Sequence, residues 1–216
     1  DGITIGLVNA TWGAHKFEFK ITGEQAHSGS TLMSDRRDAL LGAARLIVAA
    51  REIVDEFEPG MLHSACGEIN VYPNSPVVVA SEVQLLFDLR SPSSEVLRKA
   101  YERVMETVER VQREDRVGIE IIAEHSWAQN PYPEAGLDLA REVAEELDLP
   151  HDRVMTVAGH DSTNMKDTVP TVMLFVPSVE GISHNLREFT KDEDLVAGVD
   201  HLTGVVRRLA AGALVD

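Results

Sequence analysis

The sequence has little cysteine, few basic residues and no long hydrophobic run. Its single cysteine, Cys66, cannot form an intrachain disulfide, which favours a reducing compartment. Lys and Arg number 20 against 36 Asp and Glu, a formal net charge of −16 that argues against binding nucleic acid or an anionic membrane. No apolar run reaches the ~18 residues of a membrane span, and no signal-peptide pattern is present. We therefore expect a cytoplasmic protein.

The length of 216 residues, 44% of them hydrophobic, is enough for one or two domains with a buried core. The sequence starts with Asp1 rather than Met and continues directly into residues 3–8, which have the pattern of a strand. We therefore expect that the whole protein has further residues before Asp1.

Hydrophobic periodicity in residues 14–127 predicts four strands and two helices. Residues of alternating polarity, with one wet and one buried face, are typical of strands. The predicted strands are residues 15–22, 67–71, 83–89 and 117–123. Apolar residues at helical spacing run from Leu40 to Phe57 and from Leu97 to Val111. The order strand, helix, strand, strand, helix, strand predicts a ferredoxin-like unit.

Local signals also predict where the helices begin. Ser34 or Asp35 could cap the first helix, since both side chains accept hydrogen bonds from backbone N–H groups. Pro92 is typical of a first helical turn. Thr190, followed three residues later by Glu193, has the pattern of a capping box for the last helix.

The pattern changes beyond the turn-rich residues 130–133. Two helices and two strands are predicted there, and residues 171–176 are apolar on both faces, as in a covered strand of a parallel sheet. The last helix is expected to turn one stripe inward, made of Leu195, Val199, Leu202, Val206 and Leu209. So few elements make a poor domain alone. We therefore expect residues 1–13 and 128–216 to belong to one sheet whose other strands are absent.

Two polar loops of the ferredoxin-like part could carry chemistry. His27 follows a strand and is flanked by small residues, so its imidazole could exchange a proton with a bound group or could simply be solvated. Arg90 lies at a strand end that is preceded in the sequence by residues 73–75, and its guanidinium could bind a carboxylate through two hydrogen bonds. Arg90 could equally pair with Asp88 on the same face of the strand.

A third polar region consists of residues 158–162 and 181–185. The second segment follows the apolar run, and catalytic groups of open α/β sheets gather beyond strand ends. Imidazole is a common ligand of zinc, manganese and cobalt, but a catalytic zinc needs three or more protein ligands. His160, Asp161 and His184 could form such a site together, whereas one histidine alone could not.

Taken together, these segments resemble the carbamoylase branch of the M20 metallopeptidase-like amidohydrolases, which includes N-carbamoyl-L-amino acid hydrolases, β-ureidopropionases and allantoate amidohydrolases. The resemblance covers essentially all 216 residues in order. The segments that carry it are Gly-Glu-Gln-Ala-His-Ser-Gly at 23–29, Met33, residues 35–40, Phe-Asp-Leu-Arg at 87–90, Gly-His-Asp at 159–161, residues 175–178 and Gly-Ile-Ser-His-Asn at 181–185.

The resemblance implies a metal-dependent α/β hydrolase domain interrupted by a ferredoxin-like lid that forms a homodimer. Residues 14–127 would be the lid, and residues 1–13 and 128–216 would be parts of the catalytic domain. The complete enzyme would hold two divalent metal ions, zinc or else manganese or cobalt. Most of their ligands and the glutamate base would precede the present sequence, so this chain alone would bind few or no ions and would be inactive.

The resemblance also implies roles for individual residues. His184 would be a metal ligand, and His27, reaching in from the partner subunit, would stabilise the oxyanion. Arg90 would hold the substrate carboxylate. The asparagine that usually helps Arg90 is replaced by Val77, for which nearby Asn74 could compensate. The other expected substrate-binding residues are His160, Asp161, Gly181 and Ser183.

The reaction that the resemblance implies is hydrolysis of the carbamoyl or ureido C–N bond of an N-carbamoyl amino acid or a similar small ureido acid. Two alternatives are an M20 peptidase or deacylase that cleaves an amide, and a non-catalytic dimerisation module. The segments at 36–38 and 181–185 favour the carbamoylase.

Overall fold

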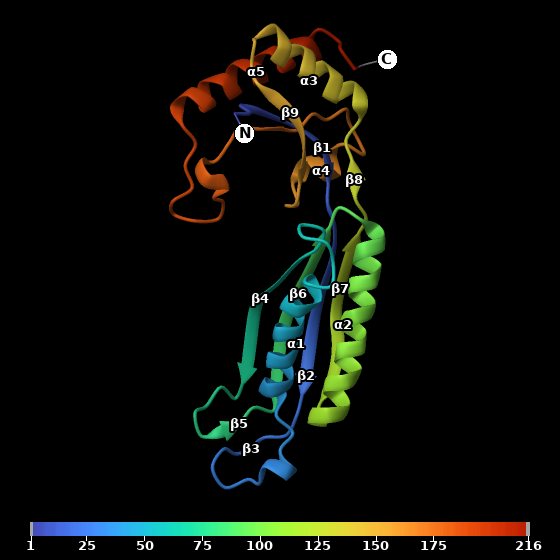
Figure 1. Cartoon of the computed structure of the whole chain (residues 1–216), viewed down its shortest axis with the longest axis vertical. Helices are drawn as coiled ribbons and strands as arrows, with labels where there is room; N and C mark the ends of the chain where they lie inside the picture. Colours follow the sequence, from blue (N-terminus) through green and yellow to red (C-terminus); the bar gives the residue numbers. More distant parts are fainter. Residues whose placement is uncertain (1, 215–216) are drawn as a thin grey trace. The chain divides into compact units, whose positions relative to one another are not determined.

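The computed structural model describes residues 2–214, which form two compact units (Figure 1). The first, called the ferredoxin-like unit below, is Trp12–Gln129. The second, called the composite unit, joins Asp1–Thr11 to Asn130–Asp216. Each unit has a hydrophobic core of its own.

The ferredoxin-like unit is a four-stranded antiparallel sheet with the strand order β4-β6-β2-β7. Helices α1 and α2 cover one face of this sheet (Figure 1). The bounds are β2 (Gly13–Thr22), α1 (Ala39–Val54), β4 (His63–Tyr72), β6 (Glu82–Ser91), α2 (Ser94–Asp115) and β7 (Gly118–Trp127). The ferredoxin-like fold that the periodicity predicts is therefore confirmed.

Alternate residues of the two central strands form the core of this unit. Phe17, Phe19 and Ile21 of β2 are fully buried, as the alternation predicts. Phe87 of β6 meets Phe17 in an edge-to-face contact with ring centroids 6.2 Å apart, a geometry that aromatic pairs favour. The intervening charged residues, such as Lys16, lie on the opposite face of the sheet.

Helix α1 begins later than predicted. The carboxylate of Asp38 accepts hydrogen bonds from the backbone N–H groups of Leu40 at 2.9 Å and Leu41 at 3.2 Å. Asp38 is therefore the capping residue, and the expectation that Ser34 or Asp35 would cap this helix is wrong. Those two residues instead belong to a separate 3₁₀ turn, η1 (Met33–Asp35).

Helix α2 also begins later than predicted, because β6 continues to Ser91. The Ser91 hydroxyl donates to the carbonyl of Met61 at 2.6 Å and accepts from the N–H of Ser93 at 3.0 Å. Ser93 then caps the helix by accepting from the N–H of Val96 at 3.4 Å. Pro92 thus lies in the connection between strand and helix rather than in the first turn.

Strand β1 (Ile5–Thr11) is the central strand of the composite unit. It pairs in parallel with β9 (His151–Thr156), and antiparallel with β8 (Asn130–Pro131) and β10 (Leu174–Phe175). The expectation of a parallel strand covered on both faces over residues 171–176 is wrong. Only two of these residues form a strand, and both are partly buried. An apolar run indicates burial, but it carries no information about strand direction.

Two long helices, α3 (Glu134–Glu146) and α5 (Asp192–Ala210), complete the composite unit, with α3 packed against both β1 and α5. The buried apolar residues of this unit are Ile5, Leu7, Leu137, Leu139, Ala140, Val143 and Val205. The shorter elements of the chain are β3 (Ala26–His27), β5 (Val78–Val79), α4 (Asp161–Met165) and η2 (Val179–Gly181). No helix among residues 2–214 is long and apolar enough to cross a membrane.

Helix α5 differs from its prediction at its start and along its apolar stripe. Lys191 is the residue before its first turn and no side chain caps it, so the capping box expected from Thr190 and Glu193 is wrong. The side chains that α5 buries are His201 and Val205. Four of the five residues expected to point inward are instead largely exposed: Leu195 (47%), Val199 (62%), Leu202 (52%) and Val206 (52%).

His201 is a buried histidine in the core of the composite unit. Its Nε2 lies 2.7 Å from the carbonyl oxygen of Ala140, and its Nδ1 is buried without a hydrogen-bond partner among the described residues. Burial disfavours the charged imidazolium and lowers the pKa of His201, although the Ala140 carbonyl opposes part of this effect.

We predict that the free energy of unfolding decreases as the pH falls from about 6.5 toward the lowered pKa of His201. In that window the unfolded chain takes up a proton that the folded chain does not bind. The loss should approach about 1.4 kcal/mol for each unit by which the pKa is lowered. Denaturant unfolding between pH 7.5 and 5 measures it, with His201→Gln as the comparison. Equal pH dependence in the two proteins would contradict the prediction.

Candidate functional site

His27 lies in a short two-stranded pairing at one end of the ferredoxin-like unit. Strand β3 places it opposite Val78 of β5. Its Nδ1 accepts hydrogen bonds from the backbone N–H groups of Gly29 at 3.0 Å and Ser30 at 3.1 Å. Because Nδ1 is an acceptor, the neutral ring carries its proton on Nε2. The exposed imidazole is therefore oriented as a hydrogen-bond donor through Nε2.

Arg36 holds the loop that follows His27. Its guanidinium donates to the carbonyl of Ser28, and through Nε and Nη2 to the carbonyl of Thr31, both at 3.2 Å. Hydrogen bonds from charged donors are stronger than neutral ones. Arg36 thus orders the turn whose N–H groups orient His27. The sequence pattern drew attention to Arg36 only through the resemblance and not for this role.

We predict that Arg36→Ala loosens the 28–31 loop while leaving the fold intact. The loss of charge-assisted hydrogen bonds should lower local stability by at least about 1.4 kcal/mol, a tenfold faster amide exchange at Gly29 and Ser30. Hydrogen exchange followed by NMR measures this. Arg37→Ala is the control, because Arg37 is exposed and only reaches Glu24 at 3.9 Å. Unchanged exchange in Arg36→Ala would contradict this role.

Asn74 and Val77 lie in the loop that leads into β5. The carbonyl of Val77 accepts from the N–H of Ser28 at 3.0 Å, so this loop is joined to the loop of His27. The Val77 side chain is exposed (57%). Asn74 is exposed and has a positive φ of 51°, a conformation in which asparagine is over-represented. The structure therefore brings Asn74, Val77 and His27 to the same end of the unit.

Arg90 is paired with Asp88 on the open face of the sheet. Its Nε and Nη2 donate to one carboxylate oxygen of Asp88, at 3.1 and 2.7 Å. Lys16 approaches the same oxygen at 3.8 Å. Of the two alternatives for Arg90, the structure contains the pairing with Asp88. A pairing of this kind also holds a guanidinium in a defined orientation.

His27 and Arg90 lie at opposite ends of the ferredoxin-like unit. Arg90 is next to the last residue of β6, whereas His27 follows β2 beyond Thr22, which pairs with Glu82 at the other end of β6. A strand of ten residues spans about 30 Å. The two ends are separated accordingly in Figure 1, where β3 and β5 lie far from the end of β6. Within one chain, the structure therefore does not bring His27 and Arg90 together.

His160 and Asp161 lie at the start of α4 in the composite unit. The Nε2 of His160 is 3.1 Å from the hydroxyl of Thr156, the last residue of β9, and its ring meets Phe175 of β10 at 5.7 Å. His160 thus contacts two strands of the sheet. Asp161 is exposed and is the first residue of the helix.

Gly181, Ser183 and His184 lie in one exposed loop after β10. A backbone hydrogen bond of 2.8 Å from Val179 to Phe189 closes this loop at its base. Gly181 and His184 both have positive φ values, 68° and 53°, and histidine is among the residues that tolerate this region. The N–H of His184 donates to the carboxylate of Glu188 at 3.0 Å, which ties the backbone and leaves the ring exposed.

The described residues do not assemble a metal centre. No group of three or more His, Cys, Asp or Glu side chains within residues 2–214 is arranged to hold a metal ion. The suggestion that His160, Asp161 and His184 form one site together is therefore not borne out. The His, Cys, Asp and Glu side chains of residues 2–214 therefore do not fit a complete metal centre by themselves.

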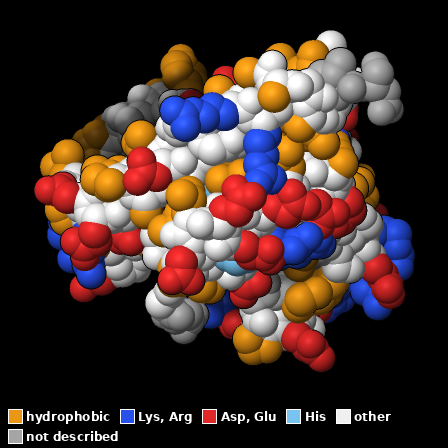
Figure 2. Space-filling view, turned by 90° about the horizontal axis from the view of Figure 1, so that it is seen from above, with side chains coloured by type: hydrophobic (Ala, Val, Ile, Leu, Met, Phe, Trp, Pro, Cys, Tyr) orange, Lys and Arg blue, Asp and Glu red, His pale blue; other side chains and the backbone are white. Residues whose placement is uncertain are grey.

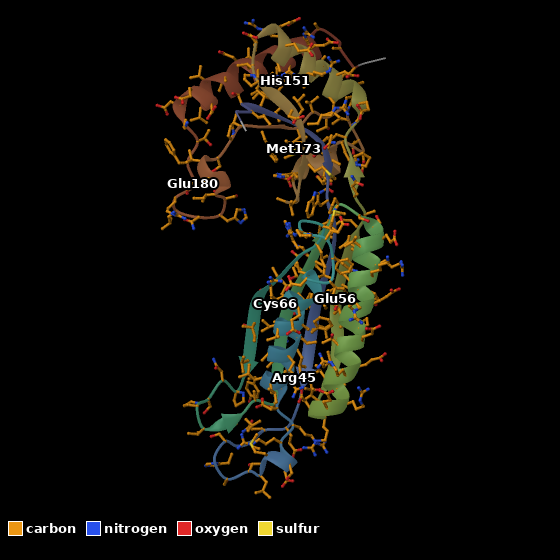
Figure 3. The ribbon with its side chains drawn as sticks, viewed as in Figure 1. Arg45, Glu56, Cys66, His151, Met173 and Glu180 are labelled. Carbon is orange, nitrogen blue, oxygen red and sulfur yellow. The ribbon has the colours of Figure 1, made fainter. Side chains whose placement is uncertain are left out.

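A hydroxyl–sulfur cluster beside the sheet was not foreseen from the sequence. The hydroxyls of Tyr132 and Ser162 are 2.6 Å apart, and each lies 3.2 Å from the sulfur of Met173, which is labelled in Figure 3. The cluster ties the start of α4 to the segments next to β8 and β10. The sequence did not indicate these contacts of Tyr132, because the prolines on either side of it predict only a turn between two parts of the chain.

Exposed ion pairs connect helices α3 and α5 of the composite unit. Arg208 of α5 pairs with Glu142 of α3 at 2.8 Å and with Glu146, and Arg141 pairs with Glu145 at 2.9 Å. Figure 2 shows basic side chains beside clusters of acidic ones, with exposed hydrophobic side chains next to them. Exposed pairs of this kind contribute little stability.

Comparison with known proteins identifies the family. Residues 5–208 match the peptidase family M20/M25/M40, and the chain belongs to this family. The expected membership of the M20 amidohydrolases is thereby confirmed.

The chain is similar to two relatives and one solved structure, as follows. A protein named as a hydrolase from Mycolicibacterium smegmatis is 49% identical over 214 residues, 99% of this chain and 49% of the relative. An N-carbamoyl-L-amino-acid amidohydrolase from Paenarthrobacter aurescens is 30% identical, over 96% of this chain and 50% of its own. The crystal structure of a hydantoinase/carbamoylase family amidase from Burkholderia vietnamiensis superposes with a TM-score of 0.89 at 32% identity, over 95% of this chain and 50% of the amidase.

The present chain spans about half the length of the curated relatives that it matches.

Proposed function

We propose that the complete protein hydrolyses the carbamoyl or ureido C–N bond of an N-carbamoyl amino acid or a similar small ureido acid. Water would add to the carbonyl carbon and the C–N bond would break, so that an N-carbamoyl amino acid yields the free amino acid, ammonia and carbon dioxide. Family membership supports hydrolysis, and the name of the P. aurescens relative supports this substrate class.

The observation that carries the proposal is the orientation of His27. A carbonyl oxygen becomes negatively charged when water adds to its carbon, and it is then stabilised by a fixed hydrogen-bond donor. The Nε2 of His27 is such a donor, because two backbone N–H groups occupy Nδ1 and Arg36 orders the turn that supplies them. His27 would therefore stabilise the oxyanion.

We propose that His27 acts on the substrate held by the partner subunit of a homodimer formed through the ferredoxin-like unit. The separation of His27 from Arg90 along a ten-residue strand supports this arrangement. Two antiparallel copies of the unit would place the His27 end of one beside the Arg90 end of the other. Strand β4 is an edge strand of the sheet and is suited to such pairing.

Substrate recognition would depend on Arg90 and its neighbours. Asp88 holds the guanidinium in place, and a substrate carboxylate would share it or replace Asp88 as partner. We propose supporting contacts from Asn74, on the loop joined to that of His27, and from the composite-unit residues His160, Asp161, Gly181 and Ser183.

We further propose that the complete enzyme depends on two divalent ions, of zinc, manganese or cobalt, and that His184 is the ligand contributed by this chain. The exposure of the His184 ring and the fixed backbone of its loop support this role. When bound, such ions would lower the pKa of a coordinated water, so that hydroxide would be available near neutral pH.

We propose a cytoplasmic location, because a single cysteine cannot form an intrachain disulfide and a reducing compartment suits such a chain. Burial raises the pKa of the Cys66 thiol to about 11, so that little thiolate exists at neutral pH. Cys66, labelled on β4 in Figure 3, is thus a poorly reactive thiol rather than a redox group.

The proposed reaction can be tested in a hybrid enzyme, in which this chain replaces the matching half of the M. smegmatis relative. We expect metal-dependent release of ammonia from N-carbamoyl-L-amino acids. His27→Ala should lower kcat about 10²- to 10³-fold, the cost of losing one oxyanion donor, with metal content unchanged. Release of a carboxylic acid from N-acyl amino acids alone would indicate a deacylase, and no turnover of either class would indicate a non-catalytic module.

The intersubunit role of His27 can be tested by mixing two inactive hybrids. His27→Ala and Arg90→Ala homodimers should each be nearly inactive. A heterodimer of the two contains one site with both residues intact, so co-expression should restore about a quarter of the wild-type activity in a random mixture. The control is co-expression of the His27→Ala protein with a tagged copy of itself. No recovery in isolated heterodimers would show that both residues act within one chain.

A further inference from the structure

Arg116 connects the end of helix α2 with the segment that follows the 28–31 loop. It is the residue at which α2 ends, and through Nη2 it donates to the backbone carbonyls of Ser34 and Arg36. The contact with the Arg36 carbonyl measures 2.8 Å. The two carbonyls lie 82 and 80 residues before Arg116 in the sequence, a separation that neither helical nor strand periodicity bridges.

The backbone of Arg116 has a conformation that arginine seldom adopts. Its φ of 56° and ψ of 39° lie in the left-handed region. Helices often end with a residue in this region, but that residue is usually glycine, because a Cβ atom makes the conformation costly. An arginine therefore occupies a position at which glycine would suit the backbone better. What arginine supplies here, and glycine cannot, is the guanidinium.

The end of α2 is a fixed point from which this side chain extends. Arg45 of α1 pairs with Glu114 at 2.9 Å and with Asp115 at 3.0 Å, the two residues before Arg116. Val117, the next residue, is buried against the core of the ferredoxin-like unit. Figure 1 shows the yellow-green end of α2 at the same end of the unit as β3 and β5. Arg116 therefore reaches the segment beside His27 from a well-anchored part of the fold.

A continuous path of hydrogen bonds leads from Arg116 to His27. Arg116 holds the backbone of Arg36, and the guanidinium of Arg36 holds two carbonyls of the 28–31 loop. The N–H groups of that loop bind Nδ1 of His27. Hydrogen bonds from guanidinium groups are stronger than neutral ones. Because Arg36 can order the loop only while its own backbone is held, the orientation of His27 depends on Arg116 as well.

We propose that Arg116 is a positioning residue for His27. Arg116 does not touch the substrate; it keeps Arg36 in place, so that Nε2 of His27 stays directed at the developing oxyanion. The effect on the reaction rests on the role proposed above for His27, whereas the coupling of Arg116 to the 28–31 loop does not. The competing role is a general one, since any positive charge at the C-terminal end of a helix stabilises that helix.

NMR of this chain tests the coupling without any catalytic readout. Arg116→Gly removes the guanidinium and leaves the residue best suited to the left-handed backbone, so the fold should be retained. We expect roughly threefold to tenfold faster amide exchange at Gly29 and Ser30. The imidazole nitrogen shifts of neutral His27 should also change from one Nε2–H tautomer to a mixture of both. Arg113→Ala should change neither, because Arg113 is an exposed arginine in the last turn of the same helix.

A double substitution shows whether Arg116 acts through Arg36. In an Arg36→Ala background, Arg116→Gly should add little to the exchange rates, because the path to His27 is already broken. Arg116→Lys keeps the charge at the end of α2 but lacks the planar fork of donors. It should therefore give the same changes as Arg116→Gly to a smaller extent, and it serves as the second variant if Arg116→Gly does not fold.

The hybrid enzyme tests the effect on the reaction. Arg116→Gly should lower kcat and kcat/KM by the same factor, about threefold to tenfold, with KM and metal content unchanged. This is the pattern for an interaction that is made only in the transition state, such as a hydrogen bond to an oxyanion. Arg113→Ala should leave both kinetic constants unchanged.

Three results would overturn the proposal. The first is unchanged exchange and an unchanged tautomer in Arg116→Gly and Arg116→Lys. The second is an equal effect of Arg113→Ala, which would identify the charge at the end of α2 as the cause. The third is full additivity of Arg116→Gly with Arg36→Ala, which would rule out the path through Arg36. An altered loop with unchanged kcat in an active hybrid would instead refute the oxyanion role of His27, while supporting the coupling of Arg116 to its loop.

Discussion

The composite unit depends on the pairing of β1 with three strands that lie more than a hundred residues away. Strand β1 pairs with β9 along its whole length, while Ala10 and Thr11 pair with Pro131 and Asn130. This last contact closes the chain at the point where it leaves for the ferredoxin-like unit and returns. The 118 residues of Trp12–Gln129 can therefore be accommodated as an inserted unit with its own core. Without the pairing, the two segments of the composite unit would have no common sheet.

The positions of the candidate site residues follow from this architecture. The inserted unit carries His27 and Arg90 at opposite ends of a long sheet, and the composite unit carries His160 and His184 beyond the ends of short strands. Hydrogen bonds orient His27 and Arg90, yet no group of three or more His, Cys, Asp or Glu side chains within residues 2–214 is arranged to hold a metal ion. In the proposed homodimer, the His27 end of one copy would lie beside the Arg90 end of the other.

Periodicity was sufficient for the ferredoxin-like unit because its sheet buries one face. Phe17, Phe19 and Ile21 alternate with charged residues, and that alternation determines both strand and face. The composite unit was harder to predict. Its apolar runs indicated burial correctly for Ile5 and Leu7, but they could not reveal that β10 is antiparallel or that α5 has two apolar sides. Helix starts were misplaced by two to four residues, since Asp38 and Ser93 compete with equally suitable caps nearby.

The sequence by itself determined the residue types of the candidate site, the fold of the inserted unit and, through its motifs, the family. These features follow from the spacing of residues along the sequence, which does not depend on tertiary contacts. Only the tertiary structure decided that Nδ1 of His27 is occupied, that Arg36 orders its loop and that Arg90 pairs with Asp88. It also decided which side of α5 faces the core. Each of these depends on contacts between segments distant in sequence or on the direction of a hydrogen bond, and hydrophobic spacing encodes neither.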